Sequence, residues 1–139
     1  MKATIYHNPK CSKSRAALEI LDKYSVETDT KLYMDKGITR AEIYDILELV
    51  NCDVSDIVRK DDVTLIDKYC HDIMVSKEGI INALVDHPVL LQRPIILFKE
   101  KGVGAIARSE DAIIKLFKSV EFDLHLLQAL GEAKKENKI

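Results

Sequence analysis

The sequence predicts one α/β domain, in which a strand–helix–strand unit and a strand–strand–helix unit are separated by a helical insert. Three observations lead to this prediction. A short apolar run near the N-terminus gives way to a helical repeat, a helix-start signal follows the second predicted strand, and a late β-favouring run precedes a loop with two glycines. The chain has 139 residues, which suits a single domain, and we expect residues 1–139 to form it.

The first unit begins with a strand at residues 3–6, where the sequence reads Ala-Thr-Ile-Tyr. From about Ser12 the apolar side chains recur at helical intervals, so we expect a helix that runs to about Tyr24. Residues 29–33 predict a second strand. Because a helix joins the two strands, they are expected to be parallel, with a right-handed crossover.

The helical insert begins at a capping box, because Thr39 and Glu42 have the spacing at which each side chain accepts the other's backbone N–H. Further helical segments are expected at residues 55–59, 63–69 and 77–86. Pro88 ends the last of these helices. The insert therefore covers about residues 39–87.

The second unit begins with the apolar strand at residues 95–98 and continues, after the glycine-containing loop, with a short strand at residues 105–107. Ser109 is the expected N-cap of the next helix, and a last helix is expected at residues 123–133. This order of units matches a thioredoxin-like core, with a mixed four-stranded sheet and a helical insertion between its two halves.

Composition and charge exclude several classes of protein. The net charge of −2 argues against nucleic-acid binding through bulk positive charge. The apolar runs are too short for a membrane span, and the chain enters a strand at once, which leaves no room for a signal peptide. Three widely spaced cysteines, Cys11, Cys52 and Cys70, predict neither a disulfide framework nor a zinc site, so we expect a reducing, cytoplasmic setting.

Cys11 stands at the junction between the first strand and the first helix. Free backbone N–H groups and the helix dipole stabilise an anion there, so the pKa of this thiol is expected to be lowered and its thiolate to be reactive. We expect the hydroxyl of Ser14, one helical turn on, to hydrogen-bond the sulfur, and His7 to add positive charge. Arg15 has two readings, facing either the site or solvent.

Four stretches together resemble the glutaredoxin-coupled arsenate reductase family, which has a thioredoxin-like fold. They are residues 7–15 (His-Asn-Pro-Lys-Cys-Ser-Lys-Ser-Arg), 59–60 (Arg-Lys), 87–95 (His-Pro-Val-Leu-Leu-Gln-Arg-Pro-Ile) and 108–110 (Arg-Ser-Glu). They occur in the family's order and span most of the chain. A single motif would be weak support, whereas four in order strongly favour this superfamily.

The resemblance implies roles for seven residues, each at a matching position of this sequence. Cys11 is the nucleophile, and His7 and Ser14 tune its thiolate. The oxyanion is held by three arginines, Arg59, Arg93 and Arg108. Pro94 is implied to be a cis-proline that faces the cysteine.

The implied reaction is reduction of arsenate to arsenite, with no bound cofactor and with glutathione as co-substrate. Cys11 attacks arsenic, glutathione reduces the adduct, and glutaredoxin resolves the mixed disulfide. Position 14 is a serine, so no C-x-x-C disulfide can form locally and an outside thiol is required.

Alternatives remain open. A close variant keeps Cys11 and glutathione but reduces another substrate. Cys52 or Cys70 would resolve Cys11 internally if the partner were of the thioredoxin type. The fold also resembles redox-sensing regulators that bind RNA polymerase, although their C-x-x-C switch is missing here because the sequence at the site reads Cys11-Ser-Lys-Ser14.

Overall fold

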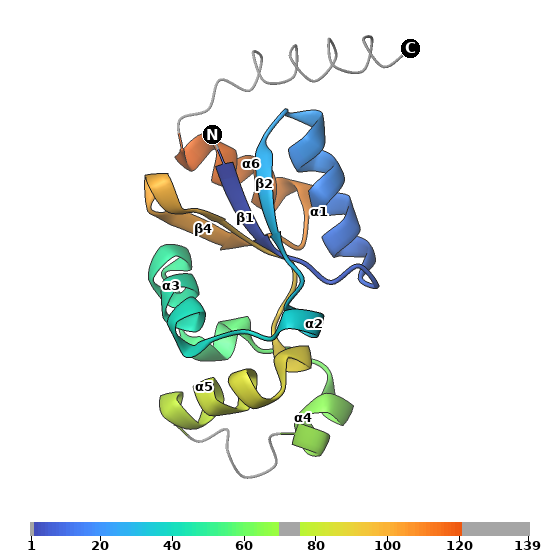
Figure 1. Cartoon of the computed structure of the whole chain (residues 1–139), viewed down its shortest axis with the longest axis vertical. Helices are drawn as coiled ribbons and strands as arrows, with labels where there is room; N and C mark the ends of the chain where they lie inside the picture. The colour runs from blue at the N-terminus through green and yellow to red at the C-terminus, as the bar shows by residue number, and fades with distance from the viewer. Residues whose placement is uncertain (1, 70–75, 121–139) are drawn as a thin grey trace.

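The computed structural model describes residues 2–69 and 76–120, and these form a mixed sheet with helices on both faces (Figure 1). The elements are, in chain order, β1 (Lys2–Tyr6), α1 (Ser12–Lys23), β2 (Glu27–Lys31), α2 (Tyr33–Lys36), α3 (Arg40–Val50), the 3₁₀ turn η1 (Val54–Ile57), α4 (Val63–Tyr69), α5 (Lys77–Asp86), η2 (Pro88–Leu90), β3 (Ile95–Phe98), η3 (Lys99–Lys101), β4 (Val103–Ile106) and α6 (Glu110–Ser119).

The sheet has the strand order β2-β1-β3-β4. β1 and β2 are parallel, as a strand–helix–strand unit requires, and β3 runs antiparallel to both β1 and β4. The predicted mixed four-stranded sheet is therefore confirmed, and it matches the sheet of thioredoxin-like proteins.

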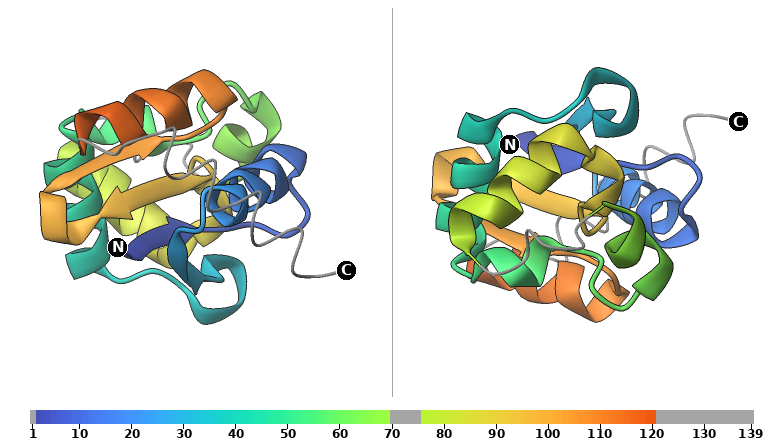
Figure 2. Two further views of the ribbon diagram at one scale, coloured as in Figure 1. Left: turned by 90° about the horizontal axis from the view of Figure 1, so that it is seen from above. Right: turned by 90° about the horizontal axis from the view of Figure 1, so that it is seen from below.

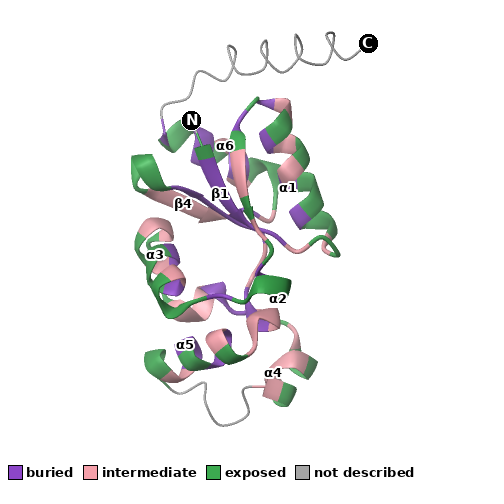
Figure 3. Ribbon diagram, in the orientation of Figure 1, coloured by how far each residue is buried: buried purple, intermediate pink, exposed green. Residues whose placement is uncertain are grey.

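Two apolar cores lie on opposite faces of this sheet, because successive side chains of a strand point to opposite sides. Ala3 and Ile5 of β1 join Ile96 of β3 in a core with α1 and α6. Tyr6 and Ile95, one position along, pack instead against the insert, which includes α3 and α5. Figure 2 shows α5 in front of the sheet when the molecule is seen from below, and the buried strand β1 appears mostly in purple in Figure 3. Full burial of each large aliphatic side chain contributes about 1.5–3 kcal/mol.

The insert follows its local signals closely. Both hydrogen bonds of the capping box between Thr39 and Glu42 are present at the start of α3. The predicted helices at residues 63–69 and 77–86 have the observed bounds of α4 and α5. The segment predicted at 55–59 is the short 3₁₀ turn η1, because an extended Val58 ends it.

Two strands differ from their predicted bounds, and pairing explains both. β2 occupies Glu27–Lys31 rather than residues 29–33, since its register with β1 runs from Lys2 to Tyr6 and stops there. β4 occupies Val103–Ile106 rather than residues 105–107, because η3 closes at Gly102, whose φ of 67° favours glycine. The helix predicted at residues 123–133 lies outside the described residues. Within the described part of the chain, no helix has the length and apolar content to span a bilayer.

Candidate active site

Cys11 is the N-cap of α1, directly after a tight turn. Its backbone is extended (φ −95°, ψ 122°), and its N–H donates to the Asn8 carbonyl at 3.0 Å, which closes the turn that contains Pro9. This turn leaves the first N–H groups of α1 free of helical partners, and those of Lys13 and Ser14 favour the thiolate form of Cys11.

The pKa of the Cys11 thiol is lowered. Partial burial opposes ionisation, but it is outweighed by the N–H of Ser14, the Arg93 guanidinium, the N–H of Lys13 and Arg108, in that order. The expected helix-terminus thiolate is therefore supported by geometry, and two of the three candidate arginines act on it.

His7 and Ser14 interact with each other rather than with the sulfur. The Ser14 hydroxyl accepts the N–H of Asn8 at 3.0 Å and lies 2.8 Å from Nδ1 of His7. The structure joins this hydroxyl to these two groups rather than to the sulfur, so the prediction that it binds the sulfur is wrong. The prediction that His7 adds positive charge is also wrong. Burial, reinforced by Arg15, lowers the pKa of His7.

Arg15 is exposed and hydrogen-bonded to the turn before α1. Its guanidinium donates to the Pro9 carbonyl at 2.8 Å on the exposed side of the turn. This bond fastens the start of α1 to the turn that precedes Cys11.

Arg59, Arg93 and Arg108 line one open cleft of about 420 Å³. The three come from different parts of the chain: after η1, before β3 and after β4. The Arg93–Pro94 peptide bond is cis, as predicted, and the Arg93 carbonyl accepts a hydrogen bond from the guanidinium of Arg108. The Arg59 N–H donates to the Leu90 carbonyl at 2.8 Å, which ties the loop after η1 to η2.

Two of these guanidiniums keep unused donors. The Nε atoms of Arg59 and Arg93 are buried, and neither has a hydrogen-bond partner in the structure. Such buried donors are costly unless a ligand satisfies them. Arg59 also pairs with Asp62 at 3.3 Å, so part of its charge is already compensated.

Tyr33 is a residue of this region that the sequence analysis missed, since it was read as the end of a strand. It is 1% exposed, and burial raises its pKa to about 12, against the opposing charges of Arg93 and Arg59 and a hydrogen bond with Asn8. The available signal was positional. Asn8 follows β1 and Tyr33 follows β2 closely, and the carboxyl ends of parallel strands meet at one edge of a sheet.

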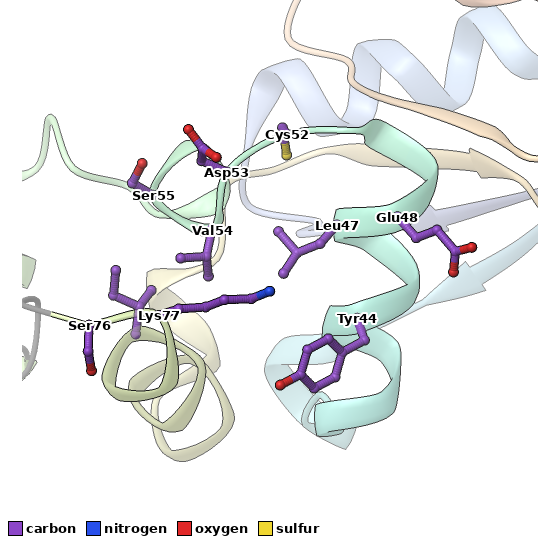
Figure 4. Close-up of a pocket in the computed structure, with 10 residues that line it drawn as sticks. Tyr44, Leu47, Glu48, Cys52, Asp53, Val54, Ser55, Ser76 and Lys77 are labelled. Carbon is purple, nitrogen blue, oxygen red and sulfur yellow. The ribbon is translucent and has the colours of Figure 1, made fainter.

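Cys52 lies in a different environment, after the C-terminus of α3. It lines a larger cleft of about 660 Å³ between α3, η1 and the start of α5 (Figure 4). Burial, with Asp56 and Asp53, raises the pKa of its thiol. The larger cleft therefore lacks the arginines and the activated thiol, and chemistry rather than size identifies the candidate site. Cys70 lies outside the described residues.

Comparison with known proteins decides the family. A model described as the ArsC family matches residues 6–116. The chain belongs to the ArsC family. This match covers all seven residues singled out by the sequence and most of the described fold.

Individual relatives agree with this ArsC assignment. The chain is 31% identical over 113 residues to protein YfgD of Escherichia coli, covering 81% of this chain and 93% of that one. It is 30% identical over 112 residues to an arsenate reductase of Neisseria meningitidis, covering 79% and 96%. Among solved structures, the arsenate reductase from Vibrio cholerae has a TM-score of 0.73 at 26% identity, covering 82% of this chain and 97% of that one.

Proposed function

We propose that this ArsC-family protein is an arsenate reductase that uses Cys11 as its nucleophile. One observation carries the proposal: a thiol with a lowered pKa lies beside Arg93 and Arg108, which share a cleft with Arg59. The family match and the arsenate reductases among its relatives support the choice of substrate.

The arginines offset the repulsion between the Cys11 thiolate and the arsenate anion. A thiolate and an arsenate anion about 4 Å apart repel by roughly 4 kcal/mol at an effective dielectric constant of 20. The N-terminus of α1 supplies about half a positive charge, which offsets only part of this. Permanently charged guanidiniums supply the rest, and their paired N–H groups fit a tetrahedral oxyanion.

In the first step, the Cys11 thiolate attacks arsenic, an S–As bond forms, and one arsenate oxygen leaves as water after it is protonated. The guanidiniums of Arg59 and Arg93, which line the cleft, would donate hydrogen bonds to the remaining oxygens. Arsenic is still in its +5 state at this stage, so a further thiol is required.

In the second step, the glutathione thiolate attacks the Cys11 sulfur, and arsenic leaves with the S–As electron pair as arsenite. Two electrons pass to arsenic, and the two sulfurs become a mixed disulfide. Glutaredoxin then attacks the glutathione side, which restores the Cys11 thiolate. No bound cofactor is needed, and a reducing cytoplasm would supply both thiols.

The need for an outside thiol rests on the surroundings of Cys11. Position 14 is a serine whose hydroxyl is engaged by His7 and Asn8. Cys52 lines a cleft that shares no residue with the arginine cleft, and its pKa is raised. Among the described residues, no second cysteine is therefore suited to resolve Cys11.

The test is arsenite formation by the purified protein with arsenate, glutathione and glutaredoxin, with each reductant omitted in turn and with thioredoxin as a replacement. We expect arsenite only with the complete glutathione system, and mass spectrometry should find glutathione on Cys11. Cys11→Ser should lose activity about a thousandfold or more, whereas the matched control Cys52→Ser should keep it.

Two outcomes would contradict the proposal. If Cys11→Ser were as active as wild type, Cys11 would not be the nucleophile. Arsenite formation with thioredoxin alone would show that an internal disulfide, rather than glutathione, resolves Cys11.

A further inference from the structure

The arginine cleft also contains two carboxylates. Asp61 and Asp62 line it together with Arg59, Arg93 and Arg108, so three positive and two negative charges surround the same space. The balance of one positive charge suits an anion of low charge. Pure oxyanion attraction would be stronger without these carboxylates, so their presence in the cleft needs an explanation.

The two carboxylates have different partners. Asp62 accepts the Leu65 N–H at 3.2 Å at the start of α4 and pairs with Arg59 at 3.3 Å. Asp61 is exposed and has no hydrogen-bond or ion-pair partner among the residues that the structure describes. Asp62 thus has a structural role beside its place in the cleft, while structure alone does not explain Asp61.

An ionised carboxylate can only accept hydrogen bonds. Arsenate and phosphate keep at least one O–H at neutral pH, and this group can donate to a carboxylate. Sulfate has the same tetrahedral shape but no O–H, so its oxygens would face carboxylate oxygens with no proton between them. Such a repulsive, unsatisfied contact is an effective way to reject a competing ligand.

We propose that Asp61 and Asp62 make this cleft selective for oxyanions that carry a proton and against fully deprotonated ones such as sulfate. The inference rests on the proposed oxyanion site and adds its selectivity. The arginines attract any tetrahedral anion, and the carboxylates discriminate by the proton. Sulfate and phosphate are both common in cells, so charge attraction alone would leave the cleft open to both.

The test uses Cys11→Ser protein, which cannot react, and measures binding of inorganic phosphate and of sulfate by calorimetry at neutral pH and constant ionic strength. We expect phosphate to bind about tenfold to a hundredfold more tightly than sulfate, the range for a hydrogen bond that involves a charged group. Adding Asp61→Asn should reduce this ratio to near one, because an amide can donate to sulfate.

Asp62→Asn is the second variant, and it keeps an oxygen that can accept the Leu65 N–H, so α4 retains its cap. The matched control is Asp67→Asn, an exposed position of α4 that does not line the cleft. It removes the same charge and should leave the ratio unchanged.

Three other binding results would each overturn part of the proposal. Equal binding of the two anions would overturn the selectivity and leave the oxyanion site intact. A ratio unaffected by both cleft variants, or shifted as much by Asp67→Asn, would overturn the role of the carboxylates. Failure of both anions to bind would overturn the oxyanion site and the selectivity together.

Discussion

Two cysteines of this chain lie at opposite ends of helices. Cys11 precedes α1, where the N–H groups of Ser14 and Lys13 lower the pKa of its thiol and Arg93 is the charge that lowers it most. Cys52 follows α3, and its charged neighbours are Asp56 and Asp53. Both thiols are partly buried, so burial raises the pKa of each. The helix end and the sign of the neighbouring charges decide that only Cys11 is favoured as a thiolate.

The difference shows that reactivity belongs to the surroundings rather than to the residue. A cysteine at a helix N-terminus needs arginines as well, because the substrate is itself an anion. The regions around the two cysteines also differ in what they bind. The arginine cleft has unused buried donors, whereas the cleft beside Cys52 contains both acidic groups and Lys77 and is otherwise lined by apolar side chains such as Leu47, Val54 and Ile80.

The largest expected effect of removing a charge is at Arg93, because this side chain lowers the pKa of the thiol and, in the proposed function, also binds the oxyanion. Arg93→Ala should lower kcat/KM for arsenate about a hundredfold to a thousandfold, the range for loss of one oxyanion donor. Steady-state arsenite formation measures it. Arg40→Ala is the control, since that arginine pairs with Glu78 on the surface of the insert. A similar loss of kcat/KM in Arg93→Ala and Arg40→Ala would contradict a specific role for Arg93.

The next largest effect is expected in the rates at which Cys11 and Cys52 are alkylated in the same sample. At neutral pH, iodoacetamide should modify Cys11 severalfold or more faster than Cys52, because a one-unit difference in pKa changes the thiolate fraction about tenfold. Peptide mass spectrometry measures both sites. In urea the preference should vanish, since it depends on folded surroundings. Faster labelling of Cys52 in the folded protein would reverse the assignment of the reactive thiol.

A smaller effect is expected at Arg59, which separates substrate binding from thiol activation. It lines the cleft but, unlike Arg93 and Arg108, is not among the main groups that lower the pKa of Cys11. Arg59→Ala should therefore raise KM for arsenate about tenfold, the loss for one partly compensated charged hydrogen bond. The pH dependence of Cys11 alkylation should not move, and a shift of its midpoint would show that Arg59 also holds the thiolate.

The smallest expected effect is on the pH dependence of the free energy of unfolding, and it comes from His7. Burial, followed by the charge of Arg15, lowers the pKa of His7 below 6.5, so the unfolded chain binds an extra proton between the two values. The free energy of unfolding should fall as the pH drops below 6.5 toward the folded-state pKa, and above 6.5 this contribution is complete. Urea denaturation across that range measures it.

His7→Gln should flatten this part of the stability profile, because the titrating group is gone. A profile that keeps its full slope in His7→Gln would assign the effect to another group.

The sequence predicted the elements whose signals are local. The apolar repeat of α1, the capping box of α3 and the β-favouring run of β3 each lie within one segment, and each element forms where expected. The bounds of β2 and β4 depend on pairing with a neighbour, and periodicity within a strand does not reveal that register.

The features of the site also differ in whether they depend on local sequence or on tertiary structure. The surroundings of Cys11 were predictable because a helix start is a local feature, and the three arginines followed from the family pattern. The neutral state of His7 depends on tertiary burial, and the pairing of Asp62 with Arg59 depends on how the loop between η1 and α4 folds. Tyr33 was missed because an aromatic residue next to Leu32 also fits the end of a strand.

The central claim, that Cys11 is held as a thiolate by the helix terminus and by Arg93, is tested most directly by the pH dependence of its alkylation in Cys52→Ser/Cys70→Ser protein. We predict a midpoint below that of an ordinary thiol, moved upward by Arg93→Ala. A midpoint at or above the ordinary value, unmoved by Arg93→Ala, would contradict the account.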